Sequence, residues 1–363
     1  MISENYQSSN TVHAKKGRIF YFDILRVIAC CSVVMIHASS TYVTYDFGGF
    51  NFWIGNIFDS ISRIGVPIFV MISGALMLDE SYEFTVKKLV AHIVKMLIFF
   101  LFWSFIYSVI NNIITPLIYH NPIVFKDFIS SFVYGHYHLW FCLMIIGLYL
   151  LVPLLRLWIK VENKKYIEYF LILSLTFTFL IPQIISVLGN YFTVLESVNS
   201  ILNNINLKYV AGYAPYFILG WYLHNFELKP KKLFYVLGIL SLIFTVVMTF
   251  VLSYTTGTAI QAYDNISVNI LLQSVAVFIL LKSLFGHVPY EKEKHNFIGF
   301  IAKNSLGIYA VHVQIVTILF DLLIMINLNI AIINILIIFI VSLAVSCLIS
   351  FVFSKIPVLK KVV

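Results

Sequence analysis

Long apolar stretches alternate with short polar stretches along the whole chain, and this pattern predicts a helical membrane protein. A helix needs about 20 residues to cross a hydrocarbon core of about 30 Å. Ten stretches are long enough, and we expect transmembrane helices near residues 19–41, 52–78, 88–114, 137–157, 166–188, 209–226, 233–254, 265–285, 298–326 and 329–353. The sequence therefore predicts an all-α fold, a polytopic bundle of about ten transmembrane helices.

The composition supports this prediction. The 363 residues are 61% hydrophobic and 11% charged, whereas a soluble domain is about 45–50% apolar and about 25% charged. The first apolar stretch is too long for a cleavable signal peptide, so we expect it to remain as a helix. The net charge of +8 does not indicate nucleic-acid binding, because basic residues gather in the cytoplasmic loops of membrane proteins.

The loop charges predict the orientation of the chain. If the N-terminus is cytoplasmic, the inner segments carry 18 basic residues and the outer loops carry two, Lys126 and Lys208. Such an excess of Lys and Arg marks cytoplasmic loops. We therefore expect both termini in the cytoplasm. The two longest outer connections, 115–136 and 189–208, could cap a cavity or help hold a polymeric substrate.

Four basic residues remain inside the predicted spans: Arg26, Arg63, Lys95 and Lys303. A charge inside a membrane costs several kcal/mol unless it is paired or faces water, so each indicates a polar interior. Lys95 and Lys303 lie near the cytoplasmic ends of their helices, from which either side chain can also reach the interface.

The first span carries three polar groups on one side. At 100° per residue, His37 lies within about 20° of Arg26 and roughly 16 Å further along the axis. Asp23 lies three residues before Arg26, on the same flank. The three side chains therefore form one polar stripe.

The second span has a polar face of its own. Asn56, Asp59, Ser60, Arg63 and Pro67 follow the spacing of one helix face, and Asp59 can pair with Arg63 four residues later. Two interpretations remain open. The pair could join helices as a buried ion pair, or Arg63 could face a water-filled site while Asp59 holds it in place.

Histidines gather in two further segments. HYHLWF places His136 and His138 at the outer mouth of the fourth span, and NSLGIYAVH places Ser305, Tyr309 and His312 on one face of the ninth. A lone membrane histidine is often structural, but several on polar faces favour a functional site. Three of them could bind a metal ion, yet the chain has no HExxH spacing and no paired carboxylate, so we expect none.

Other chemistries lack their sequence signatures. The four cysteines lie in apolar stretches without CxxC spacing, which argues against disulfides and structural metal. The chain has no Ser-His-Asp order and no phosphate-binding glycine loop, so nucleotide hydrolysis is not indicated.

Four blocks together resemble the acyltransferase-3 family of integral membrane acyltransferases. They are RIFYFDILRVIACCSVVMIHA (18–38), RIGVPIFVMISGALML (63–78), HLWFCLMIIGLYLLVPLLR (138–156) and NSLGIYAVHV (304–313). They occur in the family's order, and the ten-helix count agrees. The resemblance implies a transmembrane acyltransferase domain over residues 19–353, between cytoplasmic segments at 1–18 and 354–363.

The resemblance implies transfer of an acyl group, usually acetyl from cytoplasmic acetyl-CoA, to a hydroxyl of an extracytoplasmic glycan. It assigns Arg26 and His37 to the essential site, with Arg63 as a further candidate. Many members also carry an extracytoplasmic esterase-like domain, which we do not expect here, so the chain is similar to the stand-alone proteins that modify exopolysaccharides and other surface glycans. The implied location is a bacterial plasma membrane.

The residue chemistry fits this activity independently. Thioester-to-alcohol transfer needs a base that works near neutral pH, and histidine is the usual one. We expect His37 to be the base, with His138, His312, Asp59 and Arg63 as further catalytic candidates. Asp23 and Arg26 would dock the anionic CoA at the cytoplasmic side, since a guanidinium suits phosphate groups. Direct transfer and an acyl-imidazole on His37 both remain open, as do acetyl, succinyl and longer acyl groups.

Two other functions compete with this one. The chain could export a polysaccharide or a lipid-linked sugar, because intramembrane charges also line transport paths; against this, we find no inverted repeat. It could also be a structural partner of a polysaccharide synthase. The expected partners are thus acyl-CoA, a glycan acceptor and membrane lipid, with a synthase as a further one, and no nucleic acid. The oligomeric state is open.

Overall fold

The computed structural model describes residues 18–44, 47–81, 84–188, 200–201, 212–256, 262–291, 296–326, 328 and 330–363. Within these residues the protein is helical and has no strand. This confirms the predicted all-α class. The helices are α1 (Phe20–Ser39), α2 (Phe50–Ser62), α3 (Gly65–Met77), α4 (Val86–Val109), α5 (Thr115–Ile118), α6 (Phe125–Tyr134), α7 (Trp140–Trp158), α8 (Lys164–Ser174), α9 (Ile181–Leu188), α12 (Ala214–Asn225), α13 (Lys231–Thr256), α14 (Val268–Phe285), α15 (Asn296–Met325) and α16 (Ala331–Lys355).

Short π-helical and 3₁₀ segments connect some of these α-helices. Two π-helical segments, Ile110–Ile114 and Leu175–Leu180, join α4 to α5 and α8 to α9. A 3₁₀ turn, Tyr137–Leu139, precedes α7. A single inserted π turn is often found at functional sites, but neither segment contains a predicted site residue.

Nine helical segments of the described residues are long and apolar enough to cross a membrane. They correspond to nine of the ten predicted spans. The sixth prediction, 209–226, contains α12, which has 12 residues, and residues 202–211 lie outside the described part. The polytopic bundle is therefore confirmed, whereas the cytoplasmic location of both termini stays a prediction.

Two predicted boundaries differ from the structure. The second span is not one helix, because α2 ends at Ser62 and α3 begins at Gly65. Pro67 has no N–H to donate to the carbonyl four residues earlier, which favours a break at this point. The predicted connection 115–136 contains α5 and the ten-residue α6, which packs against α4. The other long connection, 189–208, lies almost entirely outside the described residues.

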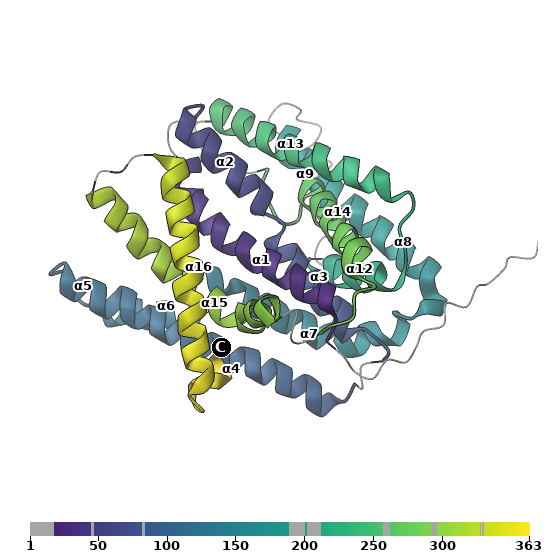
Figure 1. Ribbon diagram of the computed structural model, residues 1–363, viewed down its shortest axis with the longest axis horizontal. Coiled ribbons are helices and arrows are strands. Elements are labelled where there is room, and N and C mark those ends of the chain that lie inside the picture. The colour runs from purple at the N-terminus through teal and green to yellow at the C-terminus, as the bar shows by residue number, and fades with distance from the viewer. Residues whose placement is uncertain are drawn as a thin grey trace, which may run out of the picture.

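Helix α1 lies at the centre of the bundle (Figure 1). It contacts α2, α3, α14, α15 and α16, and most of its apolar side chains are buried. A polar stripe on this helix is therefore surrounded by protein on several sides. Its charged groups can be held away from lipid, as the cost of intramembrane charge requires.

Helices α3 and α12 cross at unusually short distance. A Cβ atom at Gly74 would lie 1.7 Å from the carbonyl oxygen of Phe217, and one at Gly220 would lie 1.9 Å from that of Met71. Only glycine permits this close backbone approach. The crossing fixes α3, which forms one wall of the site described below.

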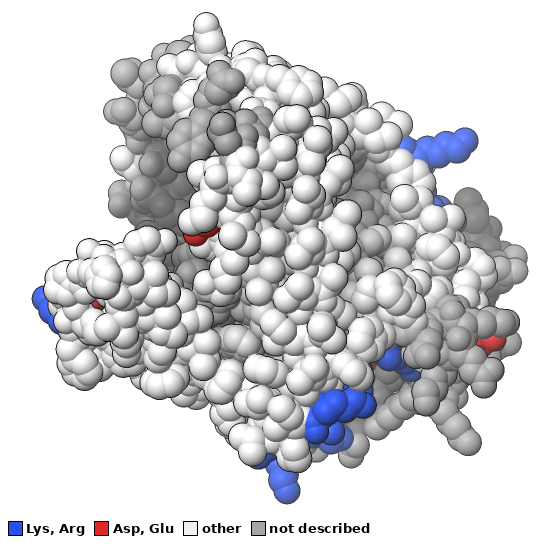
Figure 2. All heavy atoms as spheres, turned by 60° about the vertical axis from the view of Figure 1, so that its left-hand side comes forward, with Lys and Arg blue, Asp and Glu red and all other residues white. Residues whose placement is uncertain are grey.

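The outer surface has the character of a lipid-facing belt. Large apolar side chains are exposed along α4, α7, α13 and α16. On the face shown in Figure 2, Lys and Arg side chains lie mostly near the edges of the molecule, and the surface between them is almost free of charge. This distribution matches a bundle that spans a membrane.

Candidate active site

The polar stripe on α1 begins with a buried carboxylate. Asp23 is fully buried and pairs with two guanidinium groups: its Oδ2 lies 2.5 Å from Nε of Arg18, and its Oδ1 lies 3.4 Å from Nη1 of Arg26. Arg18 also donates to the carbonyl oxygen of Gly299, at 2.7 Å. Asp23 thus holds Arg26 in place and ties α1 to α15.

Arg26 opens onto a cavity of about 190 Å³. Residues of α1, α3, α4, α7 and α15 line the cavity, among them Tyr149, Ser305 and Tyr309. His37 does not line it. Ser305, Tyr309 and His312 were predicted to share one face of the ninth span. Ser305 and Tyr309 line this cavity, whereas His312 does not.

Four histidines from three segments come together next to this cavity. The ring centroids of His37 and His312 are 5.0 Å apart, and those of His138 and His312 are 5.8 Å apart. The Nδ1 atoms of His136 and His138 are 2.8 Å apart. The structure thus brings the predicted residues His37, His138 and His312 into one cluster, which we call the histidine cluster, together with His136.

The tautomer of His312 follows from its partners. Its Nδ1 lies 2.7 Å from the carbonyl oxygen of Tyr309 and 3.1 Å from that of Ile308. Because a carbonyl oxygen only accepts, Nδ1 carries the proton and Nε2 has a free lone pair. The Nε2 atoms of His312 and His138 are buried and have no hydrogen-bond partner among the described residues. Nε2 of His312 is therefore available to a proton, and Nε2 of both residues is available to a hydrogen bond with a substrate.

Tyrosines position the cluster, and sequence reasoning missed two of them. The hydroxyl of Tyr137 lies 3.2 Å from Nδ1 of His37. Tyr107 donates to the carbonyl oxygen of Ala310 at 2.8 Å and stacks on the His136 ring, with 4.3 Å between centroids. Both come from aromatic-rich membrane segments, in which no spacing rule separates them from ordinary packing residues.

The predicted pair of Asp59 and Arg63 is confirmed, with 2.7 Å between Oδ2 and Nη2. Arg63 stands at the C-cap of α2 rather than inside a continuous helix. Its guanidinium also lies 4.2 Å from the centre of the Tyr263 ring, an attractive cation–π geometry. One carboxylate oxygen of Asp59 and Nε of Arg63 are buried without a hydrogen-bond partner among the described residues.

Arg63 belongs to the surroundings of the histidine cluster. It is among the charged groups that act electrostatically on the His37 imidazole. Lys95 and Lys303, in contrast, are exposed. Across the residues that the structure describes, no group of three or more His, Cys, Asp or Glu side chains is arranged to hold a metal ion.

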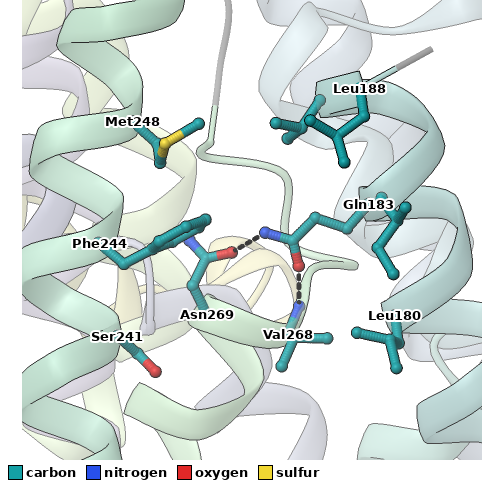
Figure 3. Close-up of a pocket in the computed structure, with 10 residues that line it drawn as sticks. Leu180, Gln183, Leu188, Ser241, Phe244, Met248, Val268 and Asn269 are labelled. Atoms are coloured by element: carbon teal, nitrogen blue, oxygen red, sulfur yellow. Dashed lines mark hydrogen bonds between the residues drawn. The ribbon is translucent and has the colours of Figure 1, made fainter. Parts of the chain in front are cut away.

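A second cavity lies away from this site. It has a volume of about 340 Å³ and lies between α9 and the pair α13 and α14. Figure 3 shows that Gln183 donates to Oδ1 of Asn269 at 2.7 Å and accepts from the backbone N–H of Val268 at 2.8 Å. Asn269 in turn donates to Oγ1 of Thr245 and to the carbonyl oxygen of Ala262. These amide groups join helices, and none of the predicted site residues lines this cavity.

Comparison with known proteins identifies the family. The sequence model of an acyltransferase domain, that of the acyltransferase-3 family, matches residues 19–352. No curated protein and no solved structure matches the chain. The match covers nearly the whole helical bundle, including α1 with its polar stripe. This multi-pass membrane chain therefore belongs to the acyltransferase-3 family.

Proposed function

We propose that the protein is a membrane O-acyltransferase that moves an acyl group from cytoplasmic acyl-CoA to a hydroxyl of an extracytoplasmic glycan. The observation that carries this proposal is the arrangement on α1. Arg26 lines a cavity at one end of the polar stripe, and His37 joins a cluster of imidazoles at the other. A donor and an acceptor that approach from opposite sides need such a route.

The Arg26 end suits an anionic donor. A guanidinium forms paired hydrogen bonds with phosphate, which an ammonium cannot. Arg26 keeps about a third of its side chain exposed while Asp23 anchors it from behind. The segments on this side carry the excess of basic residues, which supports a cytoplasmic location for the Arg26 end. Acyl-CoA would reach Arg26 from the cytoplasm. Asp23 then positions Arg26 and does not itself meet phosphate.

The His37 end suits an alcohol acceptor. The imidazole of His37 would take the proton of the acceptor hydroxyl as its oxygen attacks the thioester carbonyl. The carbon–sulfur bond then breaks, the ester forms, and the CoA thiolate takes up the proton from His37. The hydroxyl of Tyr137 beside Nδ1 of His37 fixes the ring, leaving Nε2 for this exchange.

Arg63 supplies positive charge near the reaction. Negative charge develops on the thioester oxygen as the acceptor attacks, and a fixed cation nearby stabilises it. Asp59 holds the guanidinium from one side and Tyr263 supports it from another. Nε2 of His312 has no hydrogen-bond partner among the described residues, and its ring centroid lies 5.0 Å from that of His37, so His312 can pass the proton on; His138 lies on the other side of His312, with 5.8 Å between centroids.

The acceptor side also carries exposed aromatic side chains. Tyr137, which contacts His37 and His136, is 63% exposed, and Tyr134, three residues earlier in the chain, is 80% exposed. An aromatic ring with a hydroxyl offers an apolar face and a polar edge, the combination that a sugar ring needs. These residues favour a glycan as the acceptor. The apolar belt supports a location in a membrane, and the bacterial plasma membrane is the location that the resemblance to the family implies.

Transfer of radiolabel from acetyl-CoA to surface polymer would test the proposal. Membranes that contain the chain should label the polymer, and membranes without it should not. Equal labelling in both, combined with loss of polymer from the cell surface when the chain is absent, would instead indicate an exporter. The His37→Ala protein serves as the control that the label depends on this site.

A further inference from the structure

The membrane span made of α8, the π-helical segment Leu175–Leu180 and α9 is loosely attached to the bundle. Of its most apolar 18 residues, 17% are buried, the smallest share among the candidate spans of the described residues. Polar contacts hold this span near its two ends. Tyr222 of α12 donates to Oε1 of Glu168 at 2.6 Å, and Gln183 bonds to α14 near the other end.

A third cavity lies between this span and the helices α12, α13 and α14. It has a volume of about 370 Å³, and Leu, Ile, Val and Phe side chains form most of its lining. Glu168 and Tyr222 lie at one end of the cavity, and Phe179 lies further along the span. From Glu168 to Phe179 the span rises about 16 Å, which is about half of a hydrocarbon core of about 30 Å. The third cavity is therefore about one leaflet long.

The size of the third cavity suits one hydrocarbon chain. An apolar cavity of about 150 Å³ holds one benzene molecule. By this comparison the third cavity has room for roughly 15 carbon atoms. The acyl chain of a membrane phospholipid has about this number of carbon atoms and reaches through one leaflet. A helix of a partner protein is about 10 Å wide with its side chains and does not fit.

Lysines surround the end of the third cavity at Glu168. The segments 159–168 and 226–232 adjoin each other there, because Nζ of Lys164 lies 5.1 Å from the centre of the Phe226 ring. Together the two segments carry six lysines and three glutamates. Glu168 is already paired, with 3.6 Å between its Oε1 and Nζ of Lys164. Positive charge is therefore in excess beside the mouth of an apolar cavity.

Aromatic side chains place this mouth at the membrane surface. Tyr166 and Tyr169, in the first turns of α8, are 70% and 63% exposed, and tyrosines gather at the level of lipid headgroups. Lys165 and Lys229 are exposed in the same two segments. Basic residues alone mark any cytoplasmic loop. Here they stand at the opening of a cavity that fits one chain, and this combination matches an anionic phospholipid.

We propose that the third cavity binds one acyl chain of an anionic glycerophospholipid, whose phosphate group lies at Lys165 and Lys229. The lipid belongs to the leaflet that the loop charges assign to the cytoplasmic side. Its bound chain fills the space between the loosely attached span and α14, and its second chain stays in the bilayer. This inference goes beyond the proposed function and does not depend on it.

Native mass spectrometry of the purified full-length protein tests the inference. Protein stripped of lipid in a neutral detergent is titrated with dipalmitoyl phosphatidylglycerol. Parallel titrations use dipalmitoyl phosphatidylcholine, which has the same chains without the net charge, glycerol phosphate, which has no chain, and a polyprenyl phosphate.

Two sets of variants test the two parts of the site. Leu272→Trp fills the cavity, and Leu272→Phe fills it less in case the tryptophan variant is poorly folded. Leu284→Trp is the matched control, because Leu284 is also on α14 but is 52% exposed and does not line the cavity. For the headgroup, Lys165→Gln is combined with Lys229→Gln. Its control combines Lys360→Gln with Lys361→Gln, which removes the same charge from another exposed segment.

For wild type we expect phosphatidylglycerol to bind about tenfold more tightly than phosphatidylcholine, since lysines at the membrane surface attract an anionic headgroup. Leu272→Trp should weaken phosphatidylglycerol binding about tenfold, because the chain loses several buried methylenes, and Leu284→Trp should not. The Lys165 and Lys229 double variant should lose the preference between the two phospholipids, and its control should keep it.

Three results would overturn the inference. They are equal binding of the two phospholipids to wild type, unchanged affinity in both Leu272 variants, and binding of glycerol phosphate as tight as that of phosphatidylglycerol. Tighter binding of the polyprenyl phosphate than of phosphatidylglycerol would overturn the choice of a glycerophospholipid as the occupant.

Discussion

The hydroxyl of Tyr137 lies 3.2 Å from Nδ1 of His37, and it joins the 3₁₀ turn before α7 to the end of the polar stripe on α1. A histidine base needs one nitrogen held and the other free. Tyr137 supplies the holding contact from a side chain that is itself largely exposed. The two residues are a hundred positions apart in the sequence.

Replacing this contact should weaken catalysis without unfolding the protein. Tyr137→Phe keeps the ring and removes the hydroxyl, so we expect kcat for acyl transfer to fall about tenfold, the value of one hydrogen bond of about 1.4 kcal/mol. The KM for acyl-CoA should stay the same, because the donor enters from the Arg26 side. Steady-state kinetics of purified protein measures both. A raised KM with unchanged kcat would place Tyr137 on the donor path instead.

Arg26→Lys should raise the apparent KM for acyl-CoA about tenfold or more, since a point charge replaces a guanidinium that can bind phosphate with two hydrogen bonds. The maximal rate should change less. Titration of acyl-CoA at saturating acceptor measures the effect. If Arg26 only joins helices, the variant would instead show a lower yield of folded protein in detergent and an unchanged KM.

The close crossing of α3 and α12 predicts a stability effect. Gly220→Ala places a Cβ atom 1.9 Å from the Met71 carbonyl oxygen, so the helices must separate. Overpacking of this kind costs about 1–3 kcal/mol or more, and the melting temperature in detergent should fall. Gly147→Ala is the control, because a Cβ atom there would meet nothing within 4 Å. Equal melting temperatures for the two variants would refute the close crossing.

The sequence predicted most of the helices and one side of the site. Hydropathy is enough to find membrane spans, because each must be apolar over about 20 residues. The stripe of Asp23, Arg26 and His37 follows from helical periodicity within a single segment. Both are local properties, and local properties can be predicted from one sequence without a structure.

What the sequence could not predict depends on packing between segments. Nothing in the spacing of His37, His138 and His312 says that α1, the 3₁₀ turn before α7, and α15 meet at these residues. Helix α6 lies within the predicted connection 115–136, because its ten residues are too few to span a membrane and hydropathy predicts spans only. The break at Arg63 was missed since the polar face continues across it, although Pro67 was a local signal of it.

Orientation in the membrane can be tested by fusion. A reporter that is active only outside the cytoplasm should be silent after Val363 and active when inserted near residue 125 or 200. The expected result follows from the excess of Lys and Arg in the segments assigned to the inside. Activity of the fusion after Val363 would mean that the number of spans is odd and that the donor side is wrongly assigned.

The most direct test of the account is acyl transfer by the His37→Ala protein. Positioned proton transfer contributes typically 10²–10⁴-fold to a rate, and neither a methyl group nor the amide of His37→Asn can replace it. Both variants should lose labelling of surface polymer from acetyl-CoA while their yield and melting temperature in detergent stay close to wild type. Near-normal transfer by well-folded His37→Ala would contradict the assignment of His37 as the base and direct attention to His138 or His312.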